Sequence, residues 1–118
     1  MGKIIIAVMA LLLSVHGKSE AASQNEVDAI CFCSAFFLLM SDMVDKNSPD
    51  YLKMTKYSDR MFLRAEQLTS TQEARKRVDA AVKSIMKNNT GFESRESVAK
   101  TTNSCIVVGR EQGVFPKQ

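Results

Sequence analysis

The stretch from Ala29 to Met40 reads AICFCSAFFLLM, and Ser34 is its one polar residue. At 100° per residue, a helix over 24–46 gathers its polar side chains on one side and leaves a very wide apolar arc on the other. Such an arc favours a central core helix in a small bundle. The alternative is that part of the arc is a dimer or partner surface. The arc contains Ala29, Phe32, Cys33, Phe36, Phe37, Met40, Met43 and Val44.

Three further segments have helical periodicity, and the breaks between them contain residues typical of helix ends. Pro49 suits the first position of a helix, and Ser70 and Glu73 have the spacing of a capping box. Gly91 can adopt the left-handed conformation that ends a helix. These signals predict helices over 50–68, 71–87 and 93–110.

Local propensity opposes the last of these helices, because it contains several β-branched residues that favour strand. Cys105 and Gly109 nevertheless lie on one side at helical spacing, and no segment elsewhere alternates as a strand partner would. We therefore predict an all-α domain over 22–112, a four-helix up-down-up-down bundle with short loops. Residues 113–118 are expected to be an extended, mobile tail.

The N-terminus has the pattern of a secretory signal peptide. Lys3 precedes an apolar run of twelve residues at 4–15, in which Ser14 is the one polar residue; this run is shorter than the roughly 20 residues needed to span a bilayer. Ser19-Glu20-Ala21 meets the small-x-small cleavage rule. We predict that residues 1–21 are removed. Export to a bacterial periplasm is favoured, and secretion is the alternative. A third hypothesis is a membrane-associated envelope component retained by an uncleaved leader.

Composition argues against several functional classes. The 118 residues include 16 basic and 13 acidic side chains, and removal of Lys3, Lys18 and Glu20 leaves fourteen and twelve. Because the basic and acidic side chains are nearly equal in number, we expect no nucleic-acid partner. Cleavage also removes His16, the single histidine, and with it any histidine-dependent triad or histidine-ligated metal. We expect no catalytic residue, cofactor or metal.

Three cysteines remain in the predicted mature chain. Cys33 and Cys105 lie on apolar faces near helix ends that an antiparallel first and fourth helix would bring together, so we predict a disulfide between them. Cys31 lies about 200° from Cys33 on a helix, near Asp28, and is expected to face away from the core. It is the leftover thiol, either free or paired with another chain, including a second copy. A pairing of Cys31 with Cys105, and a thiol-redox role for the C-x-C pair, are less favoured alternatives.

Two groups of charged residues are the candidates for function. Lys53, Lys56, Arg60 and Arg64 follow i, i+3, i+7, i+11 spacing opposite the predicted core stripe of their helix, and we call them the basic row. A solvated face is their simplest interpretation, and contact with an acidic partner or an anionic membrane is the functional one. Asp42 with Asp45 would be the carboxylates of an enzyme, but on an exposed helix face they are expected to be solubilising charges.

These observations favour a small exported protein that acts by contact with another protein. An inhibitor, an immunity factor, a chaperone or an accessory subunit of an envelope system would fit. A homodimer through the first helix or Cys31 is a further possibility within this class. A small carboxylate or thiol-redox enzyme is the less favoured alternative.

Overall fold

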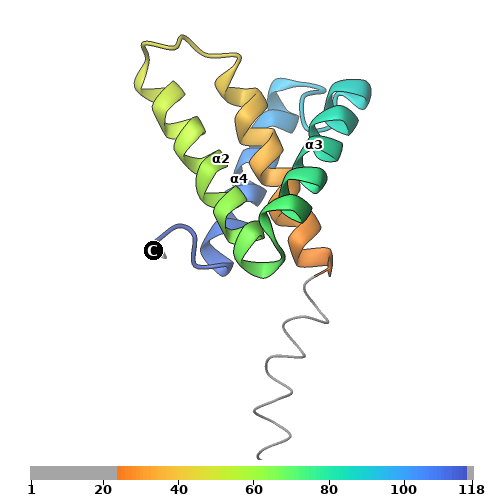
Figure 1. Ribbon diagram of the computed structural model, residues 1–118. Helices are drawn as coiled ribbons and strands as arrows, with labels where there is room; N and C mark the ends of the chain where they lie inside the picture. Colours follow the sequence, from red (N-terminus) through yellow and green to blue (C-terminus); the bar gives the residue numbers. More distant parts are fainter. Residues whose placement is uncertain (1–23, 117–118) are drawn as a thin grey trace, which may run out of the picture.

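The N-terminal helix passes through the middle of the molecule, and the other three helices pack around it (Figure 1). The computed structural model describes residues 24–116, and within this range it contains four helices and no strand. The N-terminal helix is described over 24–41. The predicted signal peptide, residues 1–21, lies outside the described residues. The predicted all-α bundle is confirmed.

Each of the other three helices begins at a serine whose side chain caps it. Ser48 accepts a hydrogen bond from the backbone N–H of Tyr51, Ser70 does the same for Glu73, and Ser94 for Ser97. Each serine thereby satisfies one of the N–H groups that a helix start leaves without an intrahelical partner. The helices are α2 (Pro49–Leu68), α3 (Thr71–Asn88) and α4 (Arg95–Glu111).

Contacts between distant residues give the directions of the helices. Arg77 of α3 donates to Asp28, so α3 starts beside the start of the N-terminal helix. Gln112, just after α4, donates to Glu26, so α4 ends there. α2 runs back along the N-terminal helix, with Ser58 beside Ser34. The order is therefore up-down-up-down, as predicted.

The core is built around the N-terminal helix, in which five successive residues, 33–37, are all buried. Five successive residues of a helix point in all directions around its axis, so over residues 33–37 this helix is covered on every side. Phe36 and Phe37 are fully buried, and α2, α3 and α4 contribute Met61, Ile85 and Cys105. The wide apolar arc seen in the sequence therefore packs mainly inside the chain.

The polar interruption in the apolar stretch has a partner on α2. The Ser34 hydroxyl donates to the carbonyl oxygen of Ser58 at 2.9 Å, and the Ser58 hydroxyl donates to the carbonyl oxygen of Ser34 at 2.8 Å. Both serines are buried, and each hydroxyl is satisfied by the other helix. The pair fixes the register of α2 on the N-terminal helix.

The disulfide joins the first and last helices. Cys33 is bonded to Cys105, with 5.4 Å between their Cα atoms and 72 residues of sequence between them. This confirms the predicted pairing, and such bonds are typical of an oxidising compartment. No helix in the described part of the chain is both long enough and apolar enough to span a bilayer.

The N-terminal helix ends at residue 41, five residues earlier than predicted. The backbone N–H groups of Asp42 and Met43 donate to Leu39 and Met40, three residues back, which tightens and closes the last turn. The chain then turns toward Pro49. Met43, predicted to lie in the core, is 69% exposed. The predicted helix was too long because the apolar periodicity of the sequence continues past the point where the turn before α2 begins.

The end of the chain differs from the predicted mobile tail. Residues 112–116, which we call the C-terminal hook, fold back after Gly113, whose φ of +73° ends α4. The N–H of Val114 donates to the carbonyl of Gly109, and that of Gly113 to Arg110, the hydrogen-bond pattern of a Schellman motif. Phe115 is consequently 7% exposed. Residues 117–118 lie outside the described range.

Phe115 fits because α4 carries a glycine beneath it. A Cβ atom at Gly109 would lie 2.3 Å from Cδ2 of Phe115, closer than real atoms approach. On its other side the Phe115 ring packs against Tyr57 and Phe37, with ring centroids 4.5 Å and 6.4 Å away. The hook is thus anchored between α4 and α2 by an aromatic side chain.

Candidate functional site

The basic row lies on α2 on the side that turns away from the core. Lys53, Lys56 and Arg60 are exposed, and Arg64 is half-buried. None of the four forms an ion pair with an acidic side chain anywhere in residues 24–116, where the ion pairs involve Arg77 and Lys100. The row therefore presents cations without bound counter-charges from the described part of the chain.

A groove runs between α2 and the C-terminal hook, with the basic row along it. It consists of two neighbouring hollows of about 320 Å³ and 400 Å³, and Arg60 lines both. We call the two hollows together the α2 groove. The first is lined by Arg60, Leu63, Arg64, Gln67, Gln112, Gly113 and Val114, and the second by Leu52, Lys53, Lys56, Tyr57, Arg60, Phe115 and Pro116.

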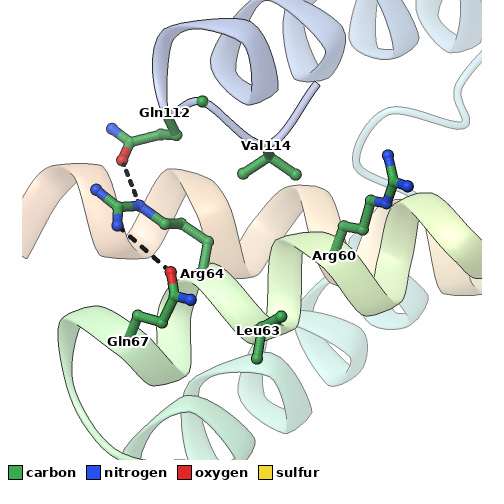
Figure 2. A pocket seen from close by; sticks show the side chains of 7 residues that line it. Arg60, Leu63, Arg64, Gln67, Gln112 and Val114 are labelled. Atoms are coloured by element: carbon green, nitrogen blue, oxygen red, sulfur yellow. Dashed lines mark hydrogen bonds between the residues drawn. The ribbon is translucent and has the colours of Figure 1, made fainter. Parts of the chain in front are cut away.

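The two hollows differ in chemistry. Polar side chains dominate the first, where Arg64 lies between the side chains of Gln67 and Gln112 while Arg60 points away from them (Figure 2). The second adds the rings of Tyr57 and Phe115 to the lysines of the row. One hollow is therefore suited to a carboxylate and the other to an apolar side chain held near cations.

Two exposed leucines border the basic row. Leu52 and Leu63 are 67% and 53% exposed, and on a helix they lie within roughly 20° of each other. The acidic residues Asp59 and Glu66 lie beyond them, on the side away from the hook. In order around α2, the acids come first, then the leucines, then the basic row, and then the hook. The cations therefore line the groove itself.

Arg64 supports the wall of the groove. Its Nε donates to Oε1 of Gln112 at 3.1 Å, and Nε2 of Gln112 donates to Glu26 at 3.0 Å. A second nitrogen of Arg64 donates to Gln67 at 3.5 Å (Figure 2). The row is therefore not four equivalent charges. Within residues 24–116, the other three cations form no hydrogen bond or ion pair through their side chains, while Arg64 also positions the hook.

The charges of the row allow it to bind anions. Lysine and arginine make charge-assisted hydrogen bonds with carboxylates, and salt weakens such bonds at exposed positions. Lys53 also lies 5.9 Å from the centre of the Tyr57 ring, which orients it along the groove. The α2 groove thus combines positive charges with apolar and aromatic side chains in its lining.

Cys31 lies elsewhere, and our prediction that it faces away from the core is wrong. It is 1% exposed, because α3 and the other helices cover even the more polar side of the N-terminal helix. Burial raises the pKa of its thiol to about 11, and the nearby Arg77 lowers it by less. A buried thiol with a raised pKa is a poor nucleophile and cannot reach a cysteine of another chain without opening the bundle.

The acidic pair is also placed differently from the prediction. Asp42 and Asp45 lie in the turn after the N-terminal helix and do not share a helix face. A carboxylate oxygen of Asp45 accepts the backbone N–H of Asn47 at 2.9 Å, so it has a role in forming the turn. Among residues 24–116, no three histidine, cysteine, aspartate or glutamate side chains lie close enough to hold a metal ion together.

Sequence reasoning identified the cations of the groove but missed its other wall. The missed residues are in the hook, above all Phe115. Gly109, Gly113 and Phe115 together were the available signal, because a glycine after a helix end followed by an apolar residue is typical of a chain that folds back onto its helix. The exposed Leu52 and Leu63 were visible as apolar residues outside the core stripe of α2.

No family model, curated protein or solved structure matches this chain.

Proposed function

We propose that this protein is an exported, non-enzymatic binding protein whose α2 groove receives a segment of another protein. The observation that carries the proposal is the groove, in which cations with no acidic partner in residues 24–116 lie between exposed leucines and an anchored hook. Charged groups at such a surface mainly govern the rate of encounter and the choice of partner. An inhibitor, chaperone or accessory subunit of an envelope system would act in this way.

The location proposed is the bacterial periplasm, with secretion as the alternative. The disulfide supports an oxidising compartment, since cytosolic proteins rarely retain one. The apolar run at 4–15 supports export through a signal peptide. N-terminal sequencing of protein purified from its native source should read from Ala22. A native chain that still begins at residue 1 would favour retention by an uncleaved leader.

Affinity capture with matched variants tests the binding surface. Wild-type protein should retain a stoichiometric protein partner from the native envelope fraction, and Lys56→Glu with Arg60→Glu should lose it. Arg64 is left unchanged because its reversal would also disturb the hook. The control is Lys83→Glu with Lys87→Glu on α3, which has the same charge change and the same spacing at exposed positions.

A second control addresses the enzyme alternative. Asp42→Asn with Asp45→Asn should capture the partner as wild type does. If the α3 control loses the partner as fully as the α2 variant, general charge is responsible and the groove is not the binding site. If the carboxylate variant loses function while the α2 variant keeps it, the enzyme hypothesis replaces ours.

A further inference from the structure

We infer that the occupant of the α2 groove is an extended acidic segment with one apolar or aromatic side chain about four residues from its principal carboxylate. This inference rests on the proposed function and specifies its ligand. It follows from the size, the spacing and the unequal chemistry of the two hollows.

The width of the groove favours an extended segment. Each hollow has a volume of about 320 to 400 Å³, and one wall is only the five-residue hook. A helix with its side chains is about 10 Å across and would rest on the rim of such hollows without filling them. An extended chain can send successive side chains into both.

The spacing of the hollows gives the separation of the two anchoring side chains. The α2 residues lining one hollow centre near position 56 and those lining the other near position 64. Eight helical residues correspond to about 12 Å. An extended chain advances about 3.3 Å per residue, so two side chains about four residues apart would reach both hollows.

The lining of each hollow assigns the two side chains. The hollow beside Tyr57 and Phe115 offers aromatic surface for an apolar side chain. The other hollow offers a carboxylate the guanidinium group of Arg64, with Arg60, which points away from it, as a second positive charge in the lining (Figure 2). Arg64 already donates to Gln112, and an incoming carboxylate would compete for the same nitrogen because it is the stronger acceptor.

An anionic membrane is the other class of ligand that basic residues and exposed leucines could bind. The structure favours the protein segment because the cations line a groove between α2 and the hook. A flat lipid surface would contact the leucine border and leave the aromatic hollow unfilled.

Designed peptides test the inference directly. The probe is a fluorescein-labelled eight-residue peptide of serines with a phenylalanine at position 2 and aspartates at positions 6 and 7. An isomer with phenylalanine next to the aspartates is the control for spacing, and a lysine-for-aspartate peptide is the control for charge. Measured by fluorescence anisotropy at low salt, the Kd of the first peptide should be at least about tenfold lower than that of either control.

Two protein variants separate the contribution of charge from that of apolar contact. Lys56→Glu with Arg60→Glu should lower the affinity for the probe at least about tenfold. Added salt should lower the affinity of the wild-type protein for the same probe. Leu52 is already 67% exposed, and Leu52→Ser should lower the affinity for the probe about fivefold. The same variant should bind an all-aspartate peptide as wild type does. Circular dichroism of both variants should match wild type, which shows that the bundle is intact.

The outcomes distinguish the two proposals. If the peptides fail to bind while partner capture still depends on Lys56 and Arg60, the proposed function stands and the ligand class is wrong. If vesicles containing one quarter phosphatidylglycerol bind through the same residues and the peptides do not, a membrane replaces the peptide. If neither capture nor the peptides depend on these residues, both proposals fall.

Discussion

Removal of the Cys33–Cys105 disulfide should cost this domain a large share of its stability. The bond closes a loop of 72 residues between the first and last helices. In the chain-entropy model, opening a loop of that length destabilises the folded state by about 4 kcal/mol. A domain of this size has a total unfolding free energy on the order of 10 kcal/mol, so the loss is severe without being fatal.

The perturbation is the double variant Cys33→Ala with Cys105→Ala, which avoids leaving a buried hydroxyl. Urea unfolding followed by circular dichroism should show a midpoint lower by roughly 2 M, given a typical denaturant dependence for a small protein. The melting temperature should fall by roughly 15 to 30 °C. The far-ultraviolet spectrum without urea should remain strongly helical.

Reductant supplies the internal control. Wild type treated with a phosphine reductant should unfold near the midpoint of the double variant, and the double variant should not respond to reductant. Cys31→Ala should keep the full reductant response, because Cys31 is not in the bond. A double variant that unfolds within about 0.5 kcal/mol of oxidised wild type would refute a stabilising crosslink between these helices.

Three further predictions concern packing and the buried thiol. Gly109→Ala should expel Phe115, lower the unfolding free energy by about 2 kcal/mol and speed proteolysis at the hook, and an unchanged cleavage rate would contradict the close approach of the two residues. Ser34→Ala and Ser58→Ala should show a coupling energy of about 1 kcal/mol in a double-mutant cycle of urea midpoints, whereas additive losses would mean that the two hydroxyls do not cooperate. The Cys31 thiol should react with Ellman's reagent at pH 8 only after urea is added, and rapid reaction of the native protein would show that Cys31 is not buried. Because the pKa of Cys31 in the folded protein, about 11, lies above the usual 9.0, its contribution to the unfolding free energy should fall as the pH rises from about 9 to 11.

The sequence was sufficient to predict the helical bundle and its crosslink. Caps such as Ser70 and the apolar periodicity are local signals, and they gave the helices to within a few residues at most ends. The pairing of Cys33 with Cys105 followed from helix direction and face. These features depend on short-range chemistry or on a topology with few alternatives.

The misplaced residues depended on what covers a helix from outside. Cys31 was predicted to be exposed because an amphipathic helix was expected to be covered on one face only, whereas Cys31 and residues 33–37 are all buried. The fate of Phe115 depended on empty space above Gly109, which is created only when α4 and α2 come together. For the same reason the basic row was recognisable in the sequence, and the groove that gives it two walls was not.

The position of the disulfide also determines how the folded chain would respond to a pulling force. Gln112 donates to Glu26, so both ends of the described chain leave from the same pole of the bundle. Under tension applied at these ends, the load would pass from Cys33 directly to Cys105, and the 72 residues of loop would carry none of it. Roughly 250 Å of contour length would thus stay hidden until the bond is reduced. The α2 groove lies mostly inside that loop, so its helix would be mechanically shielded while the hook, outside the loop, would be among the first parts to peel away.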